Sequence, residues 1–256
     1  MKKTKTWQDC GSKWFGTLVV AISVAMCFRA YFYEAGSAAT GCMQKTLWGH
    51  HTKANAEKTS WDVAPLSWLK WIWTGERIVE YKAPDSGVVR VQPHGNGLDG
   101  YADIFVGKSR WCCKLPMDAS KAIAGRYVRK GETLWNGAVC MGDFFFVNRW
   151  IWNFRRPRNG EIMVFATDGI EGLQKHVHSN RVIKRMKARP GETYVIEHPL
   201  QEHPKTVTMG EDEYFACGDN FGNSFDSRYW GCVPGKNLLG VGSLAYWPFS
   251  RLRVIR

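Results

Sequence analysis

A single cysteine in the stretch ATGCMQKTLWG, residues 39–49, is the first side chain that could do chemistry. Cys42 follows an apolar run and has three competing roles: a buried thiol, a lipid attachment point, or a nucleophile. Lipid attachment boxes follow directly on the apolar core of a signal sequence, whereas about thirteen residues, including Arg29 and Glu34, intervene here. This argues against a lipidated Cys42 and leaves the other two roles, of which the nucleophile needs a base.

The candidate base is Lys184, in the stretch NRVIKRMKARPGE at residues 180–192. A lysine can accept a proton only when its amine is neutral, and desolvation by apolar neighbours favours that form. In an extended strand Val182 shares a face with Lys184, while Ile183 points the other way. On the residues alone the alternative is a solvated basic strand end beside Arg185.

Two further stretches complete an ordered set. GDFFFVNRW spans residues 142–150, and CGDNFGNSFDSRYWGCVP spans residues 217–234. The four stretches together closely resemble bacterial type I signal peptidase, the membrane-bound serine–lysine endopeptidase that removes signal peptides from exported preproteins. The family signature is an S-M-x-P-T-L loop, a G-D-x-x-x-V strand, an I-K-R strand and a G-D-N-x-x-x-S-x-D-S-R motif. The resemblance covers residues 14–47 and 138–256, and the last motif is long enough to be specific.

The sequence departs from this signature at several positions. Cys42 stands in place of the family's serine, and Lys45 in place of the proline in S-M-x-P. Ala38–Ala39 replaces the usual Ile-Pro before the loop, and Asn159-Gly160-Glu161 replaces the usual R-G-D. The cysteine and the lysine at position 45 keep open a second interpretation, an impaired or inactive homologue that binds signal peptides or partner proteins.

The resemblance implies a role for each matched residue. Cys42 would attack the scissile carbonyl and Lys184 would be its base; Ser37 is a poor substitute nucleophile because it lies five residues before the motif position. The Thr40 hydroxyl and the Cys42 backbone N–H would stabilise the oxyanion. The supporting residues would be Ser224, Asp226, Arg228, Arg185, Asp219, Asn220 and Asp143.

The implied substrate is an extended preprotein segment with small residues at positions −1 and −3. Ala38, Met43, Val182 and Ile183 would form the shallow pocket that reads these residues. Because a bulkier aliphatic residue commonly stands where Ala38 is, we expect looser selectivity at −3. No cofactor and no metal are expected.

Cysteine changes the chemistry that the resemblance implies. A thiol is more acidic than an ammonium, so the proton could pass to the lysine and leave a thiolate. A thiolate also leaves more readily than an amine, so the tetrahedral intermediate tends to collapse backwards. We therefore predict a slower enzyme than a serine version.

An N-terminal anchor is predicted from the charge pattern. The tail 1–13 is basic, the run 14–28 is uncharged, and Tyr31–Tyr33 are interfacial aromatics. A single-pass helix over residues 14–33 would leave the tail in the cytoplasm and the remainder outside the plasma (inner) membrane. The expected partners are preprotein signal peptides, the lipid bilayer and the secretion machinery.

Composition and strand signals predict the remaining organisation. The net charge of +12 is spread thinly and no nucleic-acid-binding motif occurs, so nucleic-acid binding is not expected. The eight cysteines include no C-x-x-C pair, and His50, His51, His176 and His178 fit solvated loops better than a metal site. Short strand patterns at 142–154, 160–169, 191–199 and 204–210 predict a mostly β, antiparallel catalytic domain formed by residues 34–47 and 138–256.

Residues 48–137 form an insertion whose role the sequence does not reveal. Its most unusual feature is PLSWLKWIWTGE, residues 65–76, which carries three tryptophans in a short run. Two interpretations weigh about equally: a core element, or a patch that dips into the headgroup region of a membrane.

Overall fold

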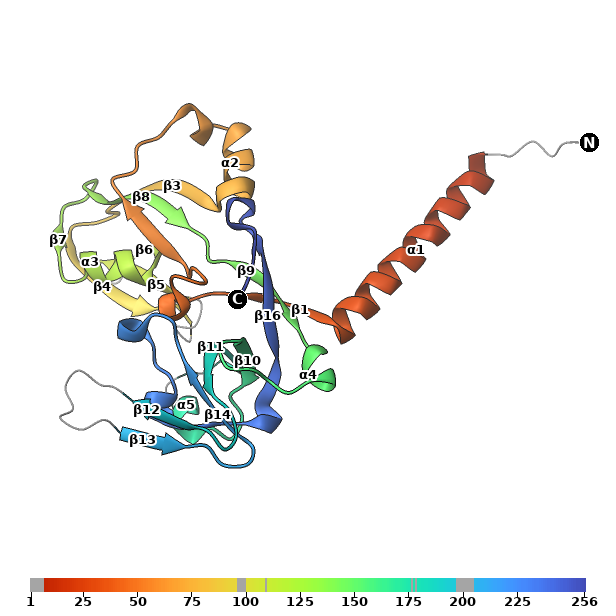
Figure 1. The fold of residues 1–256 in the computed structure, drawn as a ribbon. Helices are drawn as coiled ribbons and strands as arrows, with labels where there is room; N and C mark the ends of the chain where they lie inside the picture. The colour runs from red at the N-terminus through yellow and green to blue at the C-terminus, as the bar shows by residue number, and fades with distance from the viewer. Residues whose placement is uncertain (1–6, 96–99, 109, 176, 178, 197–204) are drawn as a thin grey trace, which may run out of the picture.

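The computed structural model describes residues 7–95, 100–108, 110–175, 177, 179–196 and 205–256. Helix α1 (Trp7–Tyr31) leads into strand β1 (Tyr33–Ser37) and projects away from the remainder of the protein (Figure 1). Among the described residues no helix combines the length and the apolar character needed to cross a membrane. The transmembrane anchor predicted over residues 14–33 is therefore not confirmed.

One eight-stranded antiparallel sheet carries the catalytic motifs. Its order is β1-β9-β16-β10-β11-β14-β15, and β17 pairs with β16. The strands after β1 are β9 (Phe144–Asn148), β10 (Ile162–Ala166), β11 (Arg181–Ala188), β14 (Glu213–Cys217), β15 (Val233–Pro234), β16 (Leu238–Trp247) and β17 (Arg253–Val254). This confirms the predicted mostly β, antiparallel class.

Strand β10 shows how the sheet separates two apolar cores. Ile162 and Val164 pack on one face with Met43 and Phe145, whereas Met163 and Phe165 pack on the other with Met186. The alternation follows from the two-residue period of a strand. The sheet is therefore covered on both faces, and its polar residues gather at ends and edges.

Strand β11 has a partly unpaired edge. All of residues 181–185 pair with β10, but β14 pairs with β11 only from Arg185 onward. Among the described strands, residues 181–184 therefore expose one row of backbone hydrogen-bonding groups. Lys184 lies at the point where pairing with β14 ends.

The insertion has a core of its own. Strands β2 (His51–Ala54), β8 (Thr133–Cys140) and β3 (Glu76–Lys82) form one sheet. A second sheet contains β6 (Arg110–Pro116), β5 (Tyr101–Val106), β4 (Gly87–Pro93) and β7 (Tyr127–Val128), covered by α3 (Met117–Ile123). The alternating burial of YADIFV in β5 is an ordinary strand pattern. Strand β8 also runs past the predicted boundary at residue 137.

The remaining elements are short. A hairpin joins β12 (Thr193–Ile196) to β13 (Lys205–Thr208), and α2 (Leu66–Thr74) lies at the end of β16 (Figure 1). The predicted strand region 142–154 ends early because the Asn148 side chain accepts hydrogen bonds from the backbone of Trp150 and Ile151. This local turn immediately precedes the helix α4 (Ile151–Phe154), whose N-cap residue is Trp150. The other single turns are α5 (Glu171–Gln174), α6 (Ser227–Trp230), η1 (Gly41–Met43), η2 (Ser60–Asp62), η3 (Phe221–Asn223), η4 (Gly235–Asn237) and η5 (Phe249–Arg251).

Candidate active site

The candidate nucleophile lies in a single 3₁₀ turn, η1, directly after strand β1. The turn is held from the C-terminal motif, since the Asn220 backbone N–H donates to the Cys42 carbonyl at 2.9 Å. The Asn220 side chain also donates to the Gly41 carbonyl at 3.0 Å. Asn220, predicted as a supporting residue, therefore holds the turn through the carbonyl oxygens of Gly41 and Cys42. The Cys42 side chain takes no part in these contacts.

Gly218 makes this approach of the two segments sterically feasible. A Cβ at position 218 would lie 2.6 Å from the Cys42 carbonyl oxygen and 2.2 Å from Ser224 Oγ. Both distances are well inside van der Waals contact, so no other residue fits without movement of the backbone. The absence of a side chain here brings the Cys42 turn and Ser224 together.

Lys184 is buried beside this junction, with 3% of its surface exposed. Its Nζ donates to Ser224 Oγ at 3.0 Å. The adjacent core contains Val182, Phe225 and Met163, the last of which is the partner of Lys184 across β10. The Lys184 amine has therefore lost most of its contact with water.

A cleft of about 890 Å³ joins these groups. Thr40, Cys42, Lys184 and Ser224 all line it. The Thr40 hydroxyl donates to Cys42 Sγ at 3.4 Å, whereas Lys184 makes its hydrogen bond with Ser224 and not with the sulfur. The structure thus brings the predicted nucleophile, base and oxyanion donor to one cleft, and hydrogen bonds of this kind often tighten only when substrate is present.

Comparison with known proteins gives a consistent result. The family described as "Signal peptidase, peptidase S26" matches residues 196–247. The probable signal peptidase I-2 of Synechocystis sp. is 31% identical over 134 residues, which are 45% of this chain and 60% of that protein. The signal peptidase I of Leptolyngbya laminosa is 31% identical over 129 residues, 44% of this chain and 64% of that protein. Over a little less than half of its length, the chain is similar to these two signal peptidases I.

The similarity is partial in length. Signal peptidase I P of Bacillus subtilis subsp. natto is 26% identical over 155 residues, covering 50% of this chain and 79% of that protein. The chain spans 60% and 64% of the two cyanobacterial relatives. A crystal structure of a signal peptidase I from Enterococcus faecalis aligns with 34% of this chain and 97% of its own, at 23% identity and a TM-score of 0.27.

The ion pair predicted from the signal peptidase motif is present behind Ser224. Asp226 is fully buried and contacts Arg228 Nε at 2.7 Å, while the Gly218 N–H donates to its other oxygen at 2.9 Å. Burial raises the pKa of Asp226, but hydrogen bonds from Arg228, Gly218 and Ser224 outweigh it and hold the pKa below its usual value. The carboxylate is thus kept charged and satisfied beneath the cleft floor.

A second ion pair lies on the other side of the Cys42 turn. Arg185 contacts Asp219 at 2.7 Å, and Thr46 donates to the same carboxylate at 2.6 Å. Burial raises the pKa of Asp219, and the contacts with Arg185 and Thr46 more than reverse this shift. Thr46 was not predicted as a site residue, although it occupies the threonine of the S-M-x-P-T-L loop.

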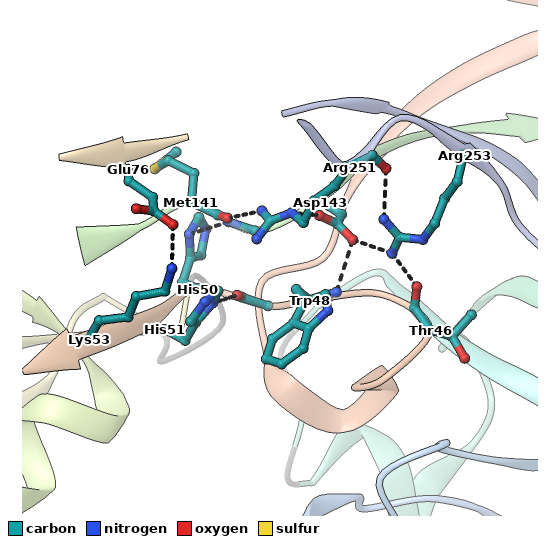
Figure 2. A network of polar contacts seen from close by, with 12 residues as sticks. Thr46, Trp48, His50, His51, Lys53, Glu76, Met141, Asp143, Arg251 and Arg253 are labelled. Carbon is teal, nitrogen blue, oxygen red and sulfur yellow. Dashed lines mark hydrogen bonds and ion pairs between the residues drawn. The ribbon is translucent and has the colours of Figure 1, made fainter. Parts of the chain in front are cut away.

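Asp143 organises a third group of contacts, on the flanks of the turn (Figure 2). Its side chain is fully buried and accepts from the Trp48 backbone at 3.0 Å and from Arg253 at 2.7 Å. Its backbone carbonyl accepts from Ala38 at 2.8 Å. Arg251 Nε lies 2.7 Å from its other oxygen, close enough for an ion pair but without the alignment of a hydrogen bond.

These contacts close the loop from both ends. Arg253 also donates to the Thr46 carbonyl, so one carboxylate and one guanidinium hold chain segments before and after Cys42. No motif points to Arg251 or Arg253, which lie at the C-terminus outside the four stretches. Only the three-dimensional structure identifies them.

Two predicted pocket residues lie elsewhere. Ala38 and Met43 are buried in the core with 2% and 0% exposure, so they do not line the cleft. Val182 and Ile183 do line it. The expectation of looser −3 selectivity rested on Ala38 and loses its structural basis. The other lining residues, missed from the sequence, are Ser37, Ala39, Leu173, Val177, Ser179, Arg181, Gly222, Asn223, Phe225 and Tyr229.

The first prediction concerns Gly218. Gly218→Ala should lower the free energy of unfolding by about 1–3 kcal/mol, because the new methyl overlaps the Cys42 carbonyl and Ser224. Gly222→Ala in the same segment is the control, since nothing lies within 4 Å of its Cβ position. Urea unfolding of the two variants measures the difference, and equal midpoints would contradict the close approach described here.

The second prediction concerns acid stability. Because the folded-state pKa of Asp226 lies below its unfolded value near 3.8, its contribution is present above that pH and is lost as the pH falls through the folded value. Asp226→Asn should lower the free energy of unfolding by about 3–5 kcal/mol at pH 7, since Arg228 is left buried without its partner. The difference in free energy of unfolding between Asp226→Asn and the parent protein should shrink as the pH approaches 2.

The matched control for this prediction is Glu132→Gln, which removes a surface ion pair with Arg126. Its urea midpoint at pH 7 should stay near that of the parent protein. A loss in Asp226→Asn no larger than in this control would show that the buried pair does not support the site.

Proposed function

We propose that this protein is a membrane-attached endopeptidase that cleaves N-terminal signal peptides from exported preproteins, with Cys42 as nucleophile and Lys184 as base. The observation that carries the proposal is the buried Lys184 amine, hydrogen-bonded to Ser224 on the wall of the cleft that also holds Cys42 and Thr40. The names of its relatives, signal peptidases I, support the substrate class.

Acylation follows from this arrangement. The neutral Lys184 amine takes the thiol proton as Cys42 Sγ bonds to the scissile carbonyl carbon, and the carbonyl π electrons move to the oxygen. The Thr40 hydroxyl, already directed at the sulfur, and the Cys42 backbone N–H would stabilise that oxyanion. The lysine then gives its proton to the departing amine as the C–N bond breaks, which leaves a thioester.

Deacylation uses the same residues in the same roles. Lys184, neutral again, accepts a proton from water while the water oxygen attacks the thioester carbonyl. The C–S bond breaks, the proton returns to the Cys42 sulfur, and the mature N-terminus and the free carboxylate of the signal peptide have both been formed. Ser224 would hold the amine in position throughout.

The cleft provides backbone groups for an extended substrate. Residues 181–184 of β11 have an unpaired edge, and both Arg181 and Ile183 line the cleft. A preprotein segment could add there as a strand, with its alternate side chains directed at the walls. Val182 and Ile183 would restrict these side chains to small ones.

Membrane attachment is part of the proposal. Helix α1 presents apolar side chains to its surroundings along its described length, among them Trp14, Leu18 and Met26, with 73%, 57% and 67% exposure. Such a surface is costly in water and favourable in lipid. We place the catalytic sheet on the extracytoplasmic side of the inner membrane, near the secretion machinery, because lysines precede the apolar run.

A processing assay tests the catalytic assignment. Cys42→Ala and Lys184→Ala should each reduce preprotein cleavage by at least about 10³-fold, because each removes a reacting group. Cys42→Ser should retain or increase the cleavage rate. A serine alkoxide leaves the tetrahedral intermediate less readily than a thiolate, so less of the intermediate returns to substrate. Cleavage is followed with a full-length preprotein in detergent, with the surface variant Glu132→Gln as the folded control.

Alkylation with iodoacetamide separates this proposal from the alternative. The parent protein should lose activity while Cys42→Ser stays active. Signal-peptide binding without turnover, unchanged in Cys42→Ala, would instead identify an inactive homologue.

Substrate selection gives a further prediction. Ile183→Ala should increase cleavage of a substrate with Leu at −3 relative to one with Ala by about 10-fold, because it removes a branched side chain from the cleft wall. Ala38→Val is the matched control, since Ala38 lies in the core, and it should leave this ratio unchanged. The ratio of the two kcat/KM values measures the effect, and an unchanged ratio in Ile183→Ala would exclude Ile183 from the −3 pocket.

A further inference from the structure

Helix α2, in the insertion, has its polar and apolar faces reversed relative to a helix in water. Its half-buried positions are Ser67, Lys70 and Thr74, spaced three and four residues apart. Its six apolar residues are all exposed: Leu66 39%, Trp68 73%, Leu69 57%, Trp71 43%, Ile72 40% and Trp73 61%. A helix on a protein surface in water buries the apolar stripe and exposes the polar one.

The reversed orientation is fixed by contacts on the polar side. Lys70, 19% exposed, forms an ion pair with Asp62 at 2.6 Å, and the helix packs on η5. At its C-terminus Gly75 lies against Pro248, where a Cβ would come within 2.5 Å of the proline ring. The helix is thus attached to the end of β16 with its tryptophans outward.

The apolar surface extends beyond the helix. Trp61 and Val63 precede it with 55% and 65% exposure, and η5, on which α2 packs, adds Phe249 with 47%. A cavity of about 240 Å³ beside Trp71 is lined by Met141, Phe144, Tyr246 and Trp247 as well. We use "α2 surface" for Trp61, Val63 and the six apolar residues of α2.

We propose that the α2 surface inserts into the headgroup–acyl boundary of a phospholipid bilayer and is a second membrane contact besides α1. This inference rests on the membrane attachment in the proposed function. Tryptophan is favoured at that boundary because its ring is apolar and its N–H is polar. The net charge of +12 adds attraction to anionic lipid.

A lipid occupant fits the α2 surface better than a second protein chain does. The six apolar residues of α2 extend over about two turns of helix, and the polar residues of the helix itself are half-buried instead of surrounding them. Specific protein interfaces place hydrogen-bonding groups around an apolar centre. A bilayer requires no such rim.

Hydroxyl-radical footprinting of the full chain in phosphatidylcholine–phosphatidylglycerol vesicles tests the proposal. Trp68 and Trp73 should be oxidised at least about ten-fold more slowly than Trp111, which is 57% exposed in the insertion. Flotation of the same sample shows whether the protein is bound to vesicles. The assay measures no peptide cleavage, so it is independent of the catalytic assignment.

The outcomes separate the two proposals. Protein that floats with the vesicles while Trp68 and Trp73 react as fast as Trp111 would overturn the α2 contact alone. Protein that does not float would contradict the membrane attachment as well. Protection that disappears at low protein-to-lipid ratio would assign the surface to a second copy of the chain and would also overturn the lipid contact.

A variant pair provides the control within the insertion. Trp68→Asp combined with Trp73→Asp should raise oxidation of Trp61 to about that of Trp111, because the charges expel the helix from the boundary. Tyr127→Asp alters a side chain that is 64% exposed on β7, on the far side of the insertion from α2 (Figure 1), and should leave Trp61 protected. Persistent protection of Trp61 in the double variant would contradict insertion through α2.

Discussion

The hydrogen bond between Lys184 and Ser224 is the interaction on which the site depends. A buried amine needs a partner, but a carboxylate in direct contact would hold it as an ammonium ion. A serine hydroxyl positions the amine and adds no negative charge. Asp226, two residues after Ser224, forms an ion pair with Arg228 and accepts a hydrogen bond from the Gly218 N–H. The Asp226 carboxylate is therefore close enough to position Ser224, and its negative charge is already balanced by Arg228.

Holding that bond next to the nucleophile requires three distant parts of the chain to converge. Gly218 lets the C-terminal motif approach the Cys42 turn, and Asn220 ties the two backbones together. Asp143 and Arg253 then hold the chain on both sides of the turn. Because these contacts go mostly to backbone atoms, the nucleophile can be replaced in sequence while the turn keeps its shape. This separation explains how a cysteine can stand at the family's serine position while the contacts of the turn are kept.

The same contacts show how a large insertion is accommodated. The chain leaves the catalytic region after Trp48 and returns at Asp143, and these two residues exchange backbone and side-chain hydrogen bonds of 2.8 and 3.0 Å (Figure 2). These hydrogen bonds thus hold the two ends of the insertion next to each other. The insertion forms its own sheets and core.

The antiparallel sheet and the residues of the four motifs could be predicted from the sequence, because strand periodicity and motif spacing are local properties. Sequence reasoning could not reach Arg251 or Arg253, whose roles come from contacts across more than a hundred residues, and the motif containing Gly218 did not show that this glycine lets Ser224 approach the Cys42 turn. It placed Ala38 in a pocket, whereas this residue, which directly follows β1, is buried in the core with Phe145. It left the tryptophan run at 65–76 undecided, because periodicity shows that a helix has two faces and not which face is buried. The ion pair of Lys70 with Asp62 decides that question here: it directs the charged side chain inward and leaves the tryptophans facing outward, at the end of the sheet that carries the candidate active site.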